Sequence, residues 1–156
     1  MTDFEPAANP SSIASVTDRV GPVGIGMPVT AVHFLGDRAV FVGGEENVAF
    51  VEPPGEVTKV AVHGGGILCA ASDGERIVTG GDDGRVVALN GKGEVTLLAT
   101  DARRRWIDTV AVHPDGAFAW SAGKTAFVRS GKGEEKSLEV PSTVGGLASG
   151  RYPQSR

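Results

Sequence analysis

Residues 67–98 read ILCAASDGERIVTGGDDGRVVALNGKGEVTLL and contain four short apolar segments separated by turn sequences. The four segments are residues 67–72, 76–81, 85–89 and 94–98. Asp-Gly and Gly-Lys-Gly, which favour tight turns, lie between them, and each segment has the length of a strand and is too short for an ordinary helix. The stretch therefore predicts one four-stranded antiparallel sheet.

The same pattern occurs once before this stretch and once after it. The strands expected before it are residues 29–34, 38–42, 48–52 and 57–63, and those expected after it are residues 106–113, 117–121, 125–129 and 136–140. The matching glycines Gly44, Gly81 and Gly123 are 37 and 42 residues apart. Propeller blades of four strands repeat at about 40 to 45 residues, so the period predicts an all-β chain that forms a partial β-propeller.

The repeats divide the chain into a lead-in, three blades and a tail. Residues 1–26 contain Pro6, Pro10 and Pro22 and predict an extended lead-in, with one strand expected over residues 13–20. The blades are expected over residues 27–65, 66–102 and 103–143. Residues 144–148 are expected to begin a fourth blade, and residues 149–156 lose the alternation, as a truncated or frame-shifted end does.

Three blades do not close a ring, because closed propellers have at least about four. Three explanations remain open: a second chain completes the ring, the copies pack in a tighter arrangement that is not a propeller, or the chain is a fragment of a longer product. The tail favours the fragment. We expect the isolated chain to self-associate or to be of marginal stability unless other blades cover its open sheet faces.

Two of the repeats resemble the WD40 repeat family. Residues 110–116, VAVHPDG, are similar to the first strand and following turn of that family, and residues 79–86, TGGDDGRV, are similar to its second strand, Asp turn and third strand. The resemblance covers about residues 27–148. It implies a WD40-like propeller with degenerate repeats that acts as a protein–protein interaction scaffold.

The resemblance also implies a buried structural network of His63, Thr79 and Asp83. Leu89 or Asn90 stands where the family has its Trp-Asp pair, so the set of residues is incomplete. A carboxylate between two strands can accept a hydrogen bond from an imidazole, and a threonine hydroxyl can complete such a network. This network is expected to stabilise the sheet and to have no catalytic role.

Composition and the amino-terminal sequence narrow the expected partners and location of the chain. The 156 residues include 19 acidic and 15 basic ones, for a net charge of −4, which disfavours nucleic acid and anionic lipid as partners. Cys69 is the single cysteine, so an internal disulfide is excluded. The acidic start MTDFEP lacks the basic and apolar regions of a signal peptide, and we expect a cytoplasmic protein.

Two groups of residues are candidates for a functional site. Arg103, Arg104, Arg105 and Trp106 form a compact basic and aromatic stretch that is a candidate partner contact, with a solvated loop as the alternative. The three histidines, His33, His63 and His113, fall at different places in their repeats and are not expected to bind one metal ion.

The sequence therefore predicts a non-enzymatic scaffold with unidentified protein partners and without catalytic residues, cofactor or metal ligands. One alternative is a propeller enzyme with a metal ion in the central channel, which needs a polar ligand at an equivalent inner-strand position of each copy. Those positions hold mainly Val, Ala, Ile and Leu. Another alternative is a truncated paralogue without an independent function.

Overall fold

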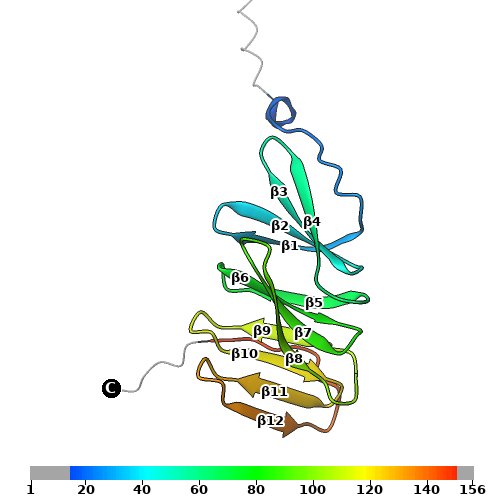
Figure 1. Ribbon diagram of the computed structural model, residues 1–156, viewed down its shortest axis with the longest axis vertical. Coiled ribbons are helices and arrows are strands. Elements are labelled where there is room, and N and C mark those ends of the chain that lie inside the picture. Colours follow the sequence, from blue (N-terminus) through cyan, green and yellow to red (C-terminus); the bar gives the residue numbers. More distant parts are fainter. Residues whose placement is uncertain (1–14, 151–156) are drawn as a thin grey trace, which may run out of the picture.

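Twelve strands form three separate antiparallel sheets in the computed structural model, which describes residues 15–150 (Figure 1). Blade 1 consists of β1 (Val29–Leu35), β2 (Arg38–Gly43), β3 (Asn47–Glu52) and β4 (Glu56–Ala61). Blade 2 consists of β5 (Ile67–Ser72), β6 (Arg76–Gly81), β7 (Arg85–Asn90) and β8 (Val95–Thr100). Blade 3 consists of β9 (Thr109–Val112), β10 (Phe118–Ala122), β11 (Thr125–Arg129) and β12 (Glu135–Glu139). Within each blade, every strand pairs with the strands that precede and follow it in that blade, as the repeat pattern predicted.

The turns between strands are stabilised by the aspartate and glycine residues of their own sequences. In blade 2, Asp73 Oδ1 accepts hydrogen bonds from the backbone N–H groups of Glu75 and Arg76, which closes the turn between β5 and β6. Gly84, in the next turn, has φ of 75°. A side chain is disfavoured at this φ, and a Cβ here would also lie 2.8 Å from the Cα of Arg104, so this turn requires glycine.

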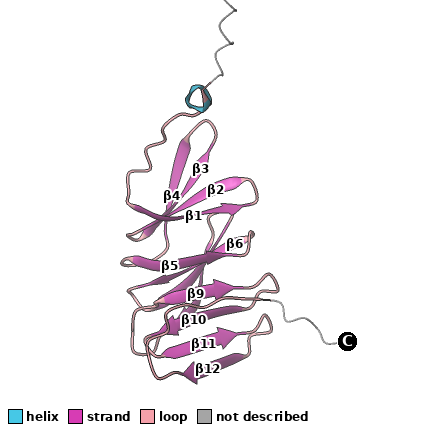
Figure 2. Ribbon diagram, turned by 180° about the vertical axis from the view of Figure 1, so that it is seen from behind, coloured by secondary structure: helices cyan, strands magenta, loops and turns pink. Residues whose placement is uncertain are grey.

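The blades stack face to face, and each junction contains one hydrophobic cluster. The cluster between blades 1 and 2 is formed by the buried residues Leu35, Val40, Val42, Val48, Phe50, Val62, Ile67, Ile77, Val87 and Leu89. The cluster between blades 2 and 3 is formed by Val78, Val86, Ala88, Ala99, Ile107, Val110, Val112, Phe118, Trp120 and Ala122. Neighbours such as Ile77 and Val78 belong to different clusters because successive side chains of a strand point to opposite faces. Figure 2 shows the first strands, β1, β5 and β9, one beneath another along the stack.

Arginine side chains also cross both junctions, one between blades 1 and 2 and two between blades 2 and 3. Arg38 donates from Nη1 to the carbonyl oxygen of Gly91 in blade 2. Arg76 donates from Nη2 to the carbonyl oxygen of Gly116 in blade 3, at 2.9 Å. Arg129 of blade 3 donates from Nη1 to the carbonyl oxygen of Leu98 in blade 2. The stack therefore has polar cross-links near its surface in addition to its apolar clusters.

The two ends of the stack differ from the expectations. Residues 144–148 form no strand; residues 144–150 instead lie across the outer face of blade 3, where the backbone N–H of Val144 donates to Gly123 O at 3.0 Å and Ser149 Oγ donates to Val112 O at 2.5 Å. Gly145 and Gly146 weaken the strand tendency of this segment, and no further strand pairs with it. The stack of three blades does not close into a ring (Figure 1).

The expected strand over residues 13–20 is also wrong where it can be followed. Val16–Arg19 forms a 3-10 helix, η1, whose first turn is capped by the Ser15 side chain. Residues 15 and 20 are in no strand, and residues 13–14 lie outside the described residues. A Ser-x-x-Asp capping box over residues 15–18 competes with the extended conformation. Over residues 15–150, no helix has the length and apolar character that crossing a membrane requires.

Candidate functional site

One edge of the stack carries the loops that connect the second strand to the third and the fourth strand to the next blade. We call this the loop edge, and it consists of residues 44–46, 62–66, 82–84, 101–108 and 123–124. Backbone hydrogen bonds join these loops: Ile67 N–H donates to Glu45 O at 3.3 Å, and Ile107 N–H donates to Gly81 O at 3.1 Å. The loops of successive blades therefore form one continuous surface.

The predicted network of His63, Thr79 and Asp83 lies beneath this edge. His63 Nδ1 lies 3.0 Å from Asp83 Oδ1, and its Nε2 lies 2.9 Å from Thr79 Oγ1. The other carboxylate oxygen of Asp83 accepts from the backbone N–H of Gly64 at 3.1 Å. His63 and Thr79 are buried, so the network joins the loop after β4 to the strand β6 in the interior.

Asp83 is held in its charged form by these contacts. Partial burial raises the pKa of its carboxyl group, but hydrogen bonds from Gly64, His63 and Arg85 outweigh burial and hold the pKa below its usual value. With every polar atom of the three side chains engaged, the network fixes the position of the loop before β5. It presents no free nucleophile or base.

A second aspartate, Asp101, organises the loop that contains the basic stretch. Asp101 Oδ2 accepts from the backbone N–H groups of Arg103 at 3.0 Å and Arg105 at 2.9 Å, and Asp101 Oδ1 accepts from Arg105 Nη2 at 2.7 Å. The hydrogen bonds from Arg105 are the main cause that lowers the pKa of the Asp101 carboxyl group. Sequence reasoning missed this role of Asp101; the spacing Asp-x-x-x-Arg directly after β8 was the available signal.

The loop divides the four residues of the basic stretch into two groups. Arg105 is structural, because its guanidinium also donates to Ala122 O at 3.0 Å and Thr125 Oγ1 at 3.2 Å in blade 3. Arg103 and Arg104 are exposed, and 63% of the surface of Trp106 is exposed. The structure thus corrects the expected first strand over residues 106–113: β9 begins at Thr109, and Trp106 lies in the loop.

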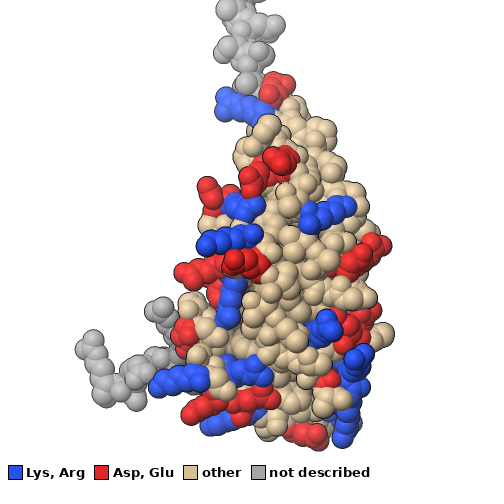
Figure 3. Space-filling model, viewed as in Figure 1, with Lys and Arg blue, Asp and Glu red and all other residues tan. Residues whose placement is uncertain are grey.

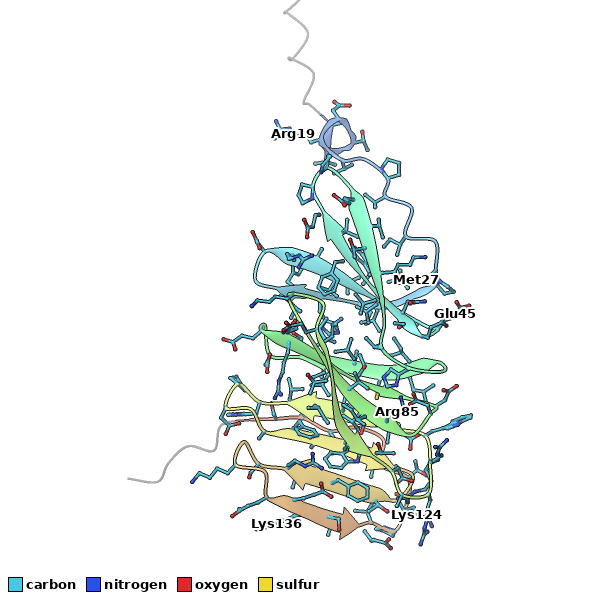
Figure 4. The ribbon with its side chains drawn as sticks, in the orientation of Figure 1. Arg19, Met27, Glu45, Arg85, Lys124 and Lys136 are labelled. Atoms are coloured by element: carbon cyan, nitrogen blue, oxygen red, sulfur yellow. The ribbon has the colours of Figure 1, made fainter. Side chains whose placement is uncertain are left out.

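Further cations that the sequence did not single out lie on the same edge. Arg85 begins β7 and Lys124 occupies the turn between β10 and β11, and both are exposed. Figure 4 shows Glu45, Arg85 and Lys124 along one edge of the stack, from blade 1 to blade 3. In Figure 3, basic side chains gather at the lower right, below a group of acidic ones. The loop edge is therefore acidic beside blade 1 and basic beside blade 3.

The exposed arginines of the loop edge differ in their ion pairs from the arginines that cross the junctions. Arg38, Arg76 and Arg129, which cross the junctions, each form an ion pair with an acid of their own blade. Within residues 15–150, no ion pair involves Arg85, Arg103 or Arg104. Their charges are available to a partner.

A groove of about 310 Å³ lies next to the Asp101 loop, between blades 2 and 3. Its lining includes Arg103, Arg105, Phe127, Glu135 and Glu139. Both charge signs face this groove, and the described part of the chain contains no group of three His, Cys, Asp or Glu side chains arranged to hold a metal ion. His33, His63 and His113 are thus not brought together.

Comparisons with solved structures agree on the architecture. The structure of U3-55K matches with a TM-score of 0.66 and 12% sequence identity, covering 80% of this chain and 43% of that one. The WD40 domain of Neurospora crassa Pan2 matches with a TM-score of 0.64 and 12% identity, covering 81% and 42%. This chain has a WD40-like propeller fold. Its three sheets are WD40-like blades that leave the ring open.

The structure of an enzyme also matches this chain. Virginiamycin B lyase from Staphylococcus aureus matches with a TM-score of 0.56 and 11% identity, covering 73% of this chain and 42% of the lyase. No protein-family model and no curated protein sequence matches this chain. The WD40-like chain spans less than half the length of each of these three solved structures.

Proposed function

We propose that this WD40-like chain is a non-enzymatic protein-interaction scaffold and that its loop edge binds an acidic segment of a partner protein. Trp106, together with Arg103 and Arg104, forms the contact. The observation that carries the proposal is the exposure of Trp106, at 63%, in a loop whose backbone is fixed by Asp101. Tryptophan and arginine are the residues most enriched at the energetic centres of protein interfaces.

The fixed backbone favours binding. Arg104 adopts a positive φ of 53° and lies against Gly84, so the loop is held in one conformation by the neighbouring turn. A loop that is already ordered loses little conformational entropy when a partner binds. Within residues 15–150, Arg103 and Arg104 form no ion pairs, so their attraction to a carboxylate-rich segment is not offset by breaking ion pairs there.

Site-specific cross-linking tests the proposal. A photoreactive benzoylphenylalanine at position 106 should capture a protein partner in the cells that produce this chain, whereas the same residue at position 92, in the turn between β7 and β8 on the opposite edge, should not. Arg103→Glu together with Arg104→Glu should abolish the product formed at position 106. Lys92→Glu together with Lys132→Glu, a matched charge reversal on the opposite edge, should leave it unchanged.

The nature of the captured product decides between partners. A product that is removed by protease and survives nuclease supports the scaffold. A product that is removed by nuclease would instead assign the loop edge to nucleic acid and overturn the proposal. Equal capture from positions 106 and 92 would also overturn it, because it would show no preference for the loop edge.

A further inference from the structure

The two sides of each blade are not equivalent. We call the side that faces the preceding blade in the chain the leading face and the side that faces the next blade the trailing face. Ile77 lies on the leading face of blade 2 and Val78 on its trailing face. Both internal junctions therefore pack a trailing face against a leading face. Within residues 15–150, no blade lies against the leading face of blade 1 or the trailing face of blade 3.

The leading face of blade 1 is aromatic and incompletely covered. Phe34 is 62% exposed and Val32 is 49% exposed, and both lie on the innermost strand β1. Phe41 lies two residues before the end of β2, the position that Thr79 has in blade 2 and Trp120 has in blade 3. Thr79 and Trp120 are buried at 1% and 3% exposure, whereas Phe41 is only half-buried. A buried position of the repeat is thus left partly open in blade 1.

The lead-in covers only the outer part of this face. Lys59 Nζ donates to Gly26 O at 2.9 Å, and Val23 lies beside Gly55, so the lead-in runs past the far strands β3 and β4. It leaves the side chains of β1 exposed. The uncovered area is therefore nearest to the axis on which β1, β5 and β9 stack (Figure 2).

The trailing face of blade 3 is built of small residues. Ala111, Ala119 and Ala126 form its centre, beside Val128, and two hollows of about 260 and 230 Å³ lie on it. The trailing face of blade 2 has the same character, with Ala71, Gly80 and Ala88, and it is packed against Trp120. The trailing face of blade 3 is thus shaped to receive an aromatic leading face.

The segment 144–150 covers this face without filling it. Leu147 lines one hollow and Ser149 the other, yet Val128 remains 45% exposed and Leu138 remains 64% exposed. The segment adds no strand to the sheet. Few hydrogen bonds hold the segment on this face, and each contributes little net free energy, so a leading sheet face can displace it.

We propose that two copies of this chain pack head to tail, with the leading face of blade 1 of each copy against the trailing face of blade 3 of the other. The two junctions are identical, so a two-fold axis closes the pair into a ring of six blades, within the range of about four to eight blades in known propellers. Segment 144–150 leaves the trailing face when the ring closes. Lys59 and Lys136 lie on the outermost strands, at the rim of the junction, where their charges stay in water.

This inference concerns the sheet faces and is independent of the loop edge, so the two proposals fail separately. Sedimentation of the full chain should give the mass of two copies and dissociation on dilution. Phe34→Asp and Val128→Lys should each weaken the dimer by at least about tenfold, since each places a charge in both junctions. Leu97→Asp is the matched control, because Leu97 is 56% exposed on a sheet that already has neighbours on both sides, and it should dimerise like the unchanged chain.

Mixing the two variants tests the head-to-tail arrangement directly. A heterodimer of the Phe34→Asp and Val128→Lys chains has one junction with opposite charges and one junction with the original residues, so mixing should restore the dimer. Circular dichroism checks that each variant is folded, and Val32→Asp and Leu138→Lys, on the same two faces, replace a variant that is not. A monomer at every concentration would overturn the proposal. So would a dimer weakened by Phe34→Asp but not by Val128→Lys, or a mixture that stays monomeric.

Discussion

The guanidinium of Arg76 donates from Nη2 to the carbonyl oxygen of Gly116 at 2.9 Å and so links blade 2 to blade 3. Asp73 holds the same guanidinium through its Nε at 3.0 Å. The side chain of Asp73 is almost fully buried, so the ion pair is sheltered from water and Arg76 is fixed in place. The contact therefore connects the turn between the first two strands of one blade to the same turn of the next.

Replacing Arg76 with Met should lower the free energy of unfolding by about 1 to 3 kcal/mol. The substitution keeps much of the aliphatic stem but removes a charged donor from two acceptors, one of them a nearly buried carboxylate. Urea unfolding followed by fluorescence measures the change. Arg85→Met is the control, because Arg85 is exposed and takes part in no ion pair of the described residues, and it should change the stability by less than about 0.5 kcal/mol. Equal effects of the two substitutions would show that Arg76 does not join the blades.

Asp83→Ala should destabilise the chain by about 1 to 3 kcal/mol, because it leaves the buried His63 Nδ1 and the N–H of Gly64 without their acceptor. The neighbouring Asp82→Ala is the control, since none of the hydrogen bonds within residues 15–150 uses its side chain. The pKa of Asp83 is lowered in the folded chain, so its stabilising effect is complete above about pH 4 and is lost as the pH falls below that value. The stability difference between the two variants should therefore shrink in acid; a constant difference would contradict this role for Asp83.

His33 should make the stability of the chain depend on pH in a higher range. It lies on β1, its Nε2 is buried and has no hydrogen-bond partner among residues 15–150, and burial lowers its pKa. The unfolded chain then binds a proton at His33 more readily than the folded one, so stability falls as the pH drops below about 6.5. His33→Gln should flatten this part of the curve. Parallel curves for His33→Gln and the unchanged chain would contradict the prediction.

Cys69 should react slowly with iodoacetamide in the folded chain. Burial raises the pKa of its thiol to about 12, and its Sγ lies 3.3 Å from Ile107 O at the junction of blades 2 and 3. Only the thiolate is an effective nucleophile, so alkylation near pH 8 requires the junction to open. Mass spectrometry of timed reactions measures the rate, and the guanidinium-unfolded chain gives the reference. Similar rates in the two states would mean that the junction is not closed around Cys69.

Alternation and turn residues predicted the blades because both act locally. The strands β5, β6 and β7 lie where the sequence of residues 67–90 predicted them. Each is bounded by an Asp-Gly or Gly-Lys-Gly turn, which ends the strand. The contacts of His63 with Thr79 and Asp83 followed from the resemblance to a known repeat, which relates residues far apart in the chain.

The parts that the sequence did not predict depend on contacts between blades. Arg105 donates hydrogen bonds to Asp101 and to blade 3. It is therefore not part of the exposed basic surface, although it directly follows Arg103 and Arg104 in the sequence. Residues 144–148 have a strand-like composition but find no strand to pair with. Trp106 was expected to begin a strand, yet the hydrogen bond that Asp101 accepts from the backbone N–H of Arg105 keeps it in the loop. In each case a tertiary contact overrides a local preference.

Nuclear Overhauser contacts between backbone protons can show whether strands pair within each repeat and whole sheets then stack. The propeller architecture predicts contacts between Thr79 and Val87 within blade 2 and between Trp120 and Phe127 within blade 3. It predicts no ladder of contacts between β8 and β9, which follow each other in the chain but belong to different blades. A continuous ladder from β8 to β9 would contradict the propeller architecture and every proposal that rests on it.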